Sequence, residues 1–218
     1  NIPNYYGLPM QDYGSDSDPV SGKVFMRITK TGGAGLDIVS IDKSNGTVSS
    51  LNLNDHSIVG YDTVLNKLLV YKYDNGNELY SVDPSNGTAT LLLDNFASSV
   101  TSWNSAAISA LDSKNRKYYR LDLSNNKIYV MNLSDGSESV LSLSSQVAAI
   151  RHDHLNGVMY GLKSGSGGGY ELVSIDKTTG TLTTIGSGNV VSGISNFSVQ
   201  IAPNDQRMYV QESGTVFR

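Results

Sequence analysis

One short segment recurs four times along the chain and constrains its fold more than any other feature. Each copy is an apolar run followed by Asp or Asn, a few polar residues and Gly. An Asp or Asn side chain accepts hydrogen bonds from backbone N–H groups just beyond it, and Gly adopts the positive φ that closes a short loop. Each copy therefore predicts two antiparallel strands joined by an Asp-to-Gly turn. The copies are Ile38–Gly46, Leu79–Gly87, Ile128–Gly136 and Leu172–Gly180.

A second recurring element, made of an apolar run, a polar turn and another apolar run, precedes each copy. Its equivalent positions are Phe25, Val70, Tyr119, Tyr160 and Tyr209, spaced 45, 49, 41 and 49 residues apart. The combined unit is four strands, and radial repetition of four-stranded sheets every ~40–50 residues is typical of a β-propeller. We therefore expect an all-β chain that forms a β-propeller of five four-stranded blades.

The first and last blades are the irregular ones in this prediction. The second strand occurs five times but the Asp-to-Gly turn only four times, so the last blade lacks its fourth strand. We expect residues 1–20 to form an N-terminal lead or a ring-closing strand, with Ile2–Leu8 as the candidate, although Asp12–Asp18 is poor strand material. Residues 21–218 then form the propeller domain. The alternatives are a piece of a longer protein or completion by a neighbouring copy, because an open sheet edge attracts a partner strand.

Composition excludes several classes of function. The absence of cysteine removes disulfide scaffolds, cysteine-ligated zinc and thiol nucleophiles. A net charge of −4 gives no basic patch for nucleic acid, and no apolar run approaches the ~20 residues of a transmembrane segment. Charged residues are only 17%, below the usual ~25%, and Ser, Thr, Asn and Gly supply the polarity. This composition indicates a secreted, periplasmic or cell-surface protein.

The copies Leu79–Gly87 and Leu172–Gly180 resemble the strand-and-turn signature of exported bacterial propeller repeats, with L-x-x-I-D-x-x-T-G-x-x-T units. More distantly they are similar to quinoprotein-type and TolB-like propellers, although the chain has one tryptophan where quinoprotein repeats carry several. The resemblance implies an exported interaction domain, often without catalytic activity. It transfers no catalytic residue to this chain.

The candidate ligand site lies in the loops of one propeller face. Trp103 and Asn104 fall in the longest loop between blades, where a tryptophan can stack on a sugar or anchor a protein and an asparagine can bond hydroxyls. Asp55, His56 and Tyr73 are expected on the same face. We predict a glycan or protein partner. The alternatives are a Trp103 folded back over the rim and solvated loop residues at the other positions.

Two clusters are candidate metal sites. His152 and His154 are two residues apart on an expected strand, so with Asp153 they could face and ligate a divalent cation. Asp12–Asp18 loosely resembles a calcium loop but lacks the glycine and terminal glutamate of the EF-hand pattern. The alternative for both is solvated turn residues. We expect no cofactor, with calcium as an open alternative.

Three functions remain open. The first is a non-catalytic binding or scaffold propeller, which the small apolar residues expected on the inner strands favour. The second is a propeller hydrolase or lactonase with a metal in the channel. The third is a subunit of a surface filament that self-assembles through the incomplete blade.

Overall fold

The structure is a computed structural model that describes residues 15–30, 35–72, 78–94, 108–192, 197–202, 207–212 and 215–217, with side chains up to Val190. The described strands form five separate sheets, and every pair of neighbouring strands is antiparallel. The chain divides into two compact units, residues 1–106 and 107–218. Within the described residues no helix is long and apolar enough to cross a membrane.

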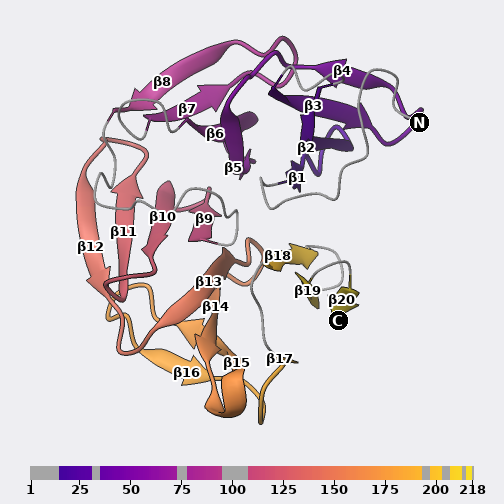
Figure 1. Cartoon of the computed structure of the whole chain (residues 1–218). Coiled ribbons are helices and arrows are strands. Elements are labelled where there is room, and N and C mark those ends of the chain that lie inside the picture. Colours follow the sequence, from indigo (N-terminus) through magenta and orange to yellow (C-terminus); the bar gives the residue numbers. More distant parts are fainter. Residues whose placement is uncertain are drawn as a thin grey trace. The chain divides into compact units, whose positions relative to one another are not determined.

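The first unit contains two four-stranded sheets, each with its strands in chain order (Figure 1). Blade 1 consists of β1 (Ser15–Ser17), β2 (Lys23–Thr29), β3 (Leu36–Asp42) and β4 (Val48–Ser50). Blade 2 consists of β5 (His56–Asp62), β6 (Lys67–Lys72), β7 (Glu78–Val82) and β8 (Ala89–Leu93).

The second unit contains two further blades and a smaller sheet. Blade 3 consists of β9 (Ser109–Asp112), β10 (Lys117–Asp122), β11 (Lys127–Asn132) and β12 (Glu138–Ser142). Blade 4 consists of β13 (Val147–His152), β14 (Met159–Ser164), β15 (Gly169–Ile175) and β16 (Leu182–Thr184), with β17 (Val191–Ser192) also on β15 and a short 3-10 turn, η3 (Ser166–Gly168). The last sheet consists of β18 (Phe197–Ala202), β19 (Arg207–Glu212) and β20 (Thr215–Phe217).

The number of four-stranded blades corrects the sequence prediction. Among the described residues there are four such blades rather than five, because the last sheet has only three strands. The first strand of blade 1 was also misjudged, since Ser15–Ser17 forms β1 within the polar stretch that looked unfavourable. Such a strand is stable because Asp16 Oδ2 accepts a hydrogen bond of 2.6 Å from the backbone N–H of Tyr61. The expected ring-closing strand, Ile2–Leu8, lies outside the described residues.

The Asp-to-Gly turns form as the sequence predicts. In each, the Gly N–H donates to the carbonyl of the leading Asp or Asn at 2.8–2.9 Å, and the Gly has φ between 72° and 75°. The side chain of the leading Asp or Asn also accepts a hydrogen bond from the backbone N–H two residues later. At Asp42 this donor is the Ser44 N–H, at 2.8 Å. Gly180 is required for a further reason, because a Cβ there would lie 2.0 Å from the carbonyl oxygen of Ser142 in blade 3. The turn of blade 4 therefore packs directly on the outer strand of its neighbour.

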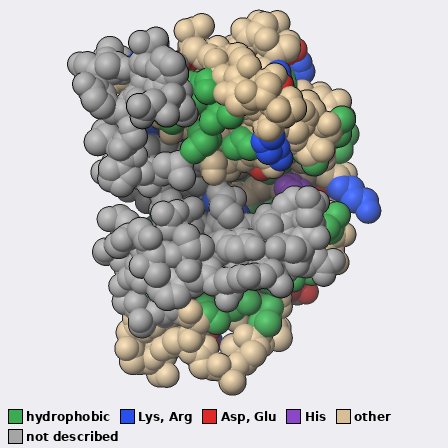
Figure 2. All heavy atoms as spheres, turned by 90° about the vertical axis from the view of Figure 1, so that its right-hand side faces the viewer, with side chains coloured by type: hydrophobic (Ala, Val, Ile, Leu, Met, Phe, Trp, Pro, Cys, Tyr) green, Lys and Arg blue, Asp and Glu red, His purple; other side chains and the backbone are tan. Residues whose placement is uncertain are grey.

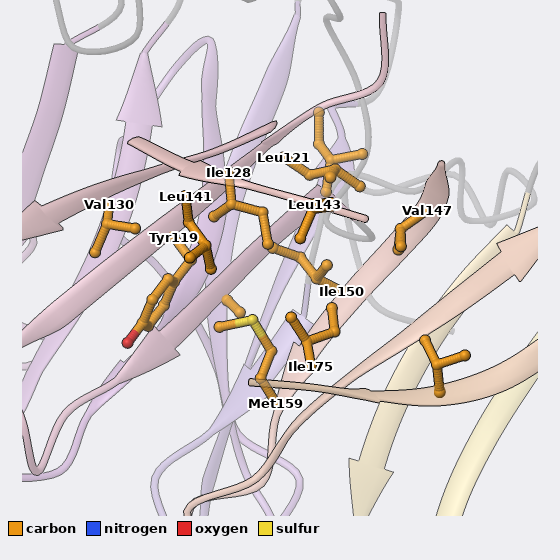
Figure 3. Close-up of a cluster of buried hydrophobic side chains, with 13 residues drawn as sticks. Tyr119, Leu121, Ile128, Val130, Leu141, Leu143, Val147, Ile150, Met159 and Ile175 are labelled. Carbon is orange, nitrogen blue, oxygen red and sulfur yellow. The ribbon is translucent and has the colours of Figure 1, made fainter. Parts of the chain in front are cut away.

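Each unit has its own hydrophobic core between its two full blades. In the first unit Phe25, Ile38, Leu68 and Val70 are fully buried, and the rings of Phe25 and Tyr61 stack with centroids 5.6 Å apart. In the second unit the core joins residues of blades 3 and 4, many of which Figure 3 labels. Of the repeat positions, Phe25, Val70 and Tyr119 are buried and Tyr160 is partly buried, while the side chain of Tyr209 lies outside the described part.

The surface follows from the composition. Figure 2 shows hydrophobic and charged side chains in small separate groups on the described part of one face, with polar side chains and backbone between them. This pattern agrees with the low content of charged residues.

Candidate functional site

Two of the five predicted ligand-site residues, Asp55 and His56, lie in the described part of the chain. Asp55 lies in the connection between blades 1 and 2, and His56 is the first residue of blade 2, both in the first unit. The other three, Trp103, Asn104 and Tyr73, lie outside the described residues. The described part of the candidate site is therefore centred on His56.

Local backbone geometry fixes the position of His56. Asn52 and Asp55 have positive φ values of 55° and 61°, a conformation that Asn and Asp adopt more readily than most residues. The buried carboxylate of Asp37 holds the same loop, since it accepts hydrogen bonds from the Leu53 N–H at 3.1 Å and the Ser50 hydroxyl at 2.5 Å. The chain thus turns sharply and places His56 at the first position of β5.

A hydrogen bond fixes which nitrogen of the His56 ring carries the proton and leaves the other nitrogen as an acceptor. Its Nδ1 lies 2.6 Å from the carbonyl oxygen of Asn54, and because a carbonyl only accepts, Nδ1 carries the proton. Burial lowers the pKa of His56, and Lys72 and Arg27 act in the same direction against Asn54 and Asp55. The ring is therefore neutral at pH 7. In the described part of the chain its second nitrogen, Nε2, has no hydrogen-bond partner.

Two side chains of β7 complete this cluster. The Tyr80 ring meets the His56 ring edge-on, with centroids 5.4 Å apart and an interplanar angle of 71°. The Tyr80 hydroxyl donates to Glu78 Oε2 at 2.6 Å, and this hydrogen bond raises the pKa of Tyr80 to about 12. His56, Lys72 and Glu78 are paired across three strands, so they form one row at the end of blade 2.

Blade 1 contributes two basic side chains to the same end of the unit. Lys30 Nζ donates to Asn54 Oδ1 at 2.7 Å, and Arg27 Nη1 donates to the Ser57 hydroxyl at 3.1 Å. Sequence reasoning missed Arg27, Lys30, Glu78 and Tyr80. Strand register places these four side chains near His56. The only signal of this placement in the sequence is the two-residue spacing of Glu78 and Tyr80, which puts both on one face of a strand.

A second cluster of titratable groups lies in the second unit, between blades 3 and 4. Lys177 Nζ is 2.7 Å from Asp112 Oδ2 and 3.1 Å from His152 Nε2, and the latter two atoms are 3.2 Å apart. Asn115 Nδ2 also donates to Asp112 Oδ2, at 2.9 Å. The side chains of Asp112 and His152 are only 1% and 2% exposed.

Lys177 is the cation of this cluster. Burial lowers the pKa of His152 to about 4, so its ring is neutral at pH 7 and Nε2 accepts a hydrogen bond from Lys177. Burial acts to raise the pKa of Asp112, but hydrogen bonds from Asn115 and Lys177 bring it down to about 2. The contact between Asp112 and His152 is therefore not an ion pair.

An equivalent contact between neighbouring blades is present in the first unit. His152 directly precedes the buried turn residue Asp153 and meets the turn residue of the preceding blade, Asp112. Tyr61 directly precedes the buried turn residue Asp62 and is hydrogen-bonded to the turn residue of the preceding blade, Asp18. The matching positions indicate that the His152 cluster joins neighbouring blades.

The three predicted metal ligands have different environments. Asp153 accepts hydrogen bonds within its own turn, from the Leu155 N–H at 2.9 Å and from Asn156 Nδ2 at 2.7 Å. His154 is exposed, and its ring meets that of His152 edge-on. Within the described residues no group of three or more His, Asp and Glu side chains is arranged to hold a metal ion. The metal at His152, Asp153 and His154 stays a prediction.

The described end of the calcium-like stretch also makes hydrogen bonds within the chain. Asp16 accepts from the backbone N–H groups of Ser17 and Tyr61, and Asp18 accepts from the Val20 N–H at 2.8 Å and from the Ser21 hydroxyl. Residues 12–14 lie outside the described part, and calcium binding there stays a prediction.

The strand order and the recurring turns define the protein as an all-β β-propeller. No family model matches the chain, and no curated protein matches it. Among solved structures, the chain is similar to a protein of unknown function from Bacteroides thetaiotaomicron VPI-5482, with a TM-score of 0.64, 10% identity, and coverage of 93% of this chain and 53% of that one.

Two further structures show the same fold. TolB from Acinetobacter baumannii matches with a TM-score of 0.57 and 13% identity over 90% of this chain and 52% of that one. A chain of a nidogen/laminin complex matches with a TM-score of 0.55 and 12% identity over 80% of this chain and 63% of that one. The chain thus spans between half and two thirds of the length of these structures, and at such low identity the likeness concerns the fold alone.

Proposed function

We propose that this chain is a non-catalytic binding propeller that acts outside the cytoplasm, in the periplasm or at the cell surface, and recognises a glycan. The observation that carries the proposal is the neutral His56 ring, which has an acceptor nitrogen without a described partner beside the aromatic ring of Tyr80. Trp103, Asn104 and Tyr73, expected on the same face, would extend the site. A protein partner is the alternative, and the nidogen/laminin complex is an example of a protein assembly that includes a similar fold.

The environment of the other titratable cluster favours binding over catalysis. A general acid or base has to reach the proton that it transfers. Asp112 and His152 are almost fully buried, and Lys177 and Asn115 already bond to Asp112. Tyr61 occupies the position equivalent to His152 and joins blades 1 and 2. A structural role in joining blades 3 and 4 therefore explains the His152 cluster, and no catalytic role is needed. A propeller hydrolase with a channel metal and a filament subunit remain the alternative functions.

A glycan array tests the proposal. We expect the wild-type chain to bind a defined set of glycans and His56→Ala and Trp103→Ala each to weaken that binding. Lys114→Ala is the control, because Lys114 is an exposed side chain in the other unit and belongs to neither candidate site. A wild-type chain that binds no glycan would refute the proposal. Binding that both His56→Ala and Trp103→Ala leave unchanged would refute the site.

A further inference from the structure

The charges around His56 point to an uncharged ligand. Three basic side chains contribute to the cluster: Arg27 in β2, Lys30 directly after β2 and Lys72 in β6. Among the described residues the acidic groups are also three: Asp55 acts on His56, while Glu78 and Asp94 act on Tyr80. The formal charges of these six described groups cancel, so together they favour neither anions nor cations as a class.

The hydrogen-bonding state of His56 selects a donor on the ligand. Its Nδ1 proton is engaged with the Asn54 carbonyl, so a neutral ring offers only the Nε2 lone pair. A carboxylate ligand has no proton to give to that lone pair at neutral pH. A hydroxyl group has one, and it can also accept hydrogen bonds from neighbouring lysine or arginine side chains.

We infer that His56 Nε2 accepts a hydrogen bond from a hydroxyl of a neutral carbohydrate, beside the edge-packed ring of Tyr80. This inference rests on the proposed function and deepens it, because it names the class of glycan and the atom that recognises it. A sugar presents several hydroxyls at once and so matches a cluster in which donors and acceptors are mixed. A peptide N–H could donate to Nε2 as well, but the acceptor of a peptide group is a separate carbonyl oxygen, whereas one sugar hydroxyl both donates and accepts.

Protonation of His56 provides a readout that a purely structural role would not give. In acid Nε2 gains a proton and becomes a donor, so the acceptor is lost. Because burial lowers the pKa of His56 from its ordinary 6.5, affinity for a neutral sugar is constant above pH 6.5 and weakens only at lower pH. The groups that set this titration are Lys72, Arg27, Asp55 and the Asn54 carbonyl.

The test uses the full chain with matched neutral and acidic oligosaccharides, the acidic set carrying uronic or sialic acids. We expect neutral oligosaccharides to bind more tightly, and titration calorimetry to show about tenfold weaker binding for His56→Ala, the size of one lost hydrogen bond. His56→Gln, whose amide oxygen is an acceptor, should retain part of the affinity, and the exposed control Lys114→Ala should retain all of it. Circular dichroism checks that each variant folds.

The outcomes separate the inference from the proposed function. A preference for acidic glycans, tighter binding as the pH falls, or equal affinity in His56→Ala and wild type would overturn the inference while leaving a glycan-binding propeller. If no glycan binds the wild-type chain at any pH, both fail together.

Discussion

Acidification should destabilise the second unit through His152. Burial lowers the pKa of this side chain from 6.5 to about 4 in the folded chain. Between these two pH values the unfolded chain binds a proton at His152 that the folded chain does not. The free energy of unfolding therefore falls as the pH drops from 6.5 to 4, and this contribution is absent above pH 6.5.

The magnitude follows from the size of the shift. Each pKa unit corresponds to about 1.4 kcal/mol, so a shift from 6.5 to about 4 corresponds to a loss of about 3 kcal/mol at pH 4. Solvent does little to screen this effect, because the side chain of His152 is only 2% exposed. Asp112, whose pKa is lowered to about 2, loses its own contribution only below its ordinary value of 3.8, so the two effects occupy separate pH ranges.

The variant that isolates this effect is His152→Leu. Leu111 occupies the equivalent position in blade 3 and is 4% exposed, so a leucine suits this place in the repeat. The Lys177–Asp112 pair at 2.7 Å does not involve the imidazole and stays in place. Urea unfolding followed by circular dichroism between pH 7.5 and 4 measures the free energy for wild type, His152→Leu and the exposed control His154→Gln.

We expect the wild type and His154→Gln to lose about 3 kcal/mol more than His152→Leu over this range. His56, whose pKa is also lowered, contributes equally to all three proteins and cancels in the comparison. Parallel pH profiles for His152→Leu and wild type would refute the reasoning, because the buried neutral imidazole would then not be the group that titrates.

Two further predictions concern packing and charge between blades. Gly180→Ala should cost more stability than Gly46→Ala in thermal unfolding: both glycines have positive φ, which costs about 1 kcal/mol for alanine, but only at Gly180 would a Cβ also overlap the Ser142 carbonyl. Equal losses of stability in the two variants would show that the contact between blades adds no cost to that of the backbone conformation. Lys177→Met should raise the pKa of His152, because the ammonium 3.1 Å from Nε2 disfavours a second positive charge. An NMR titration of the imidazole measures this pKa, and an unchanged or lower value would contradict the assignment of Lys177 as the cation.

The turns were predictable from sequence because their chemistry is local. An Asp or Asn and a Gly four residues later contain both the side-chain acceptor and the positive φ that the turn needs, as at Asp42 and Gly46. The four-stranded unit followed from the spacing of these turns. The strand β1 was missed because its stability depends on a contact between Asp16 and Tyr61, which are 45 residues apart.

The partners within the two clusters were less predictable than the turns. His56 was identified as a candidate from its expected loop face, and His152 from its two-residue spacing to His154. Their partners, Tyr80 for the first and Lys177 for the second, are brought in by strand register and by packing between blades. The bond between Lys177 and Asp112 spans 65 residues, and no local pattern encodes it. Sequence reasoning thus found single residues but not the environments that set their charge.

The packing of Gly180 against Ser142 has a consequence for how such chains lengthen. Gly87 makes the same kind of approach in the first unit, where a Cβ would lie 2.3 Å from the Leu51 carbonyl. In both pairs of blades the joint has two complementary parts: the glycine of the later blade and a carbonyl at the end of the blade before it. A repeat that carried both parts would fit its own copy once its gene segment was duplicated in tandem. Growth by duplication would then require no compensating substitution at this contact.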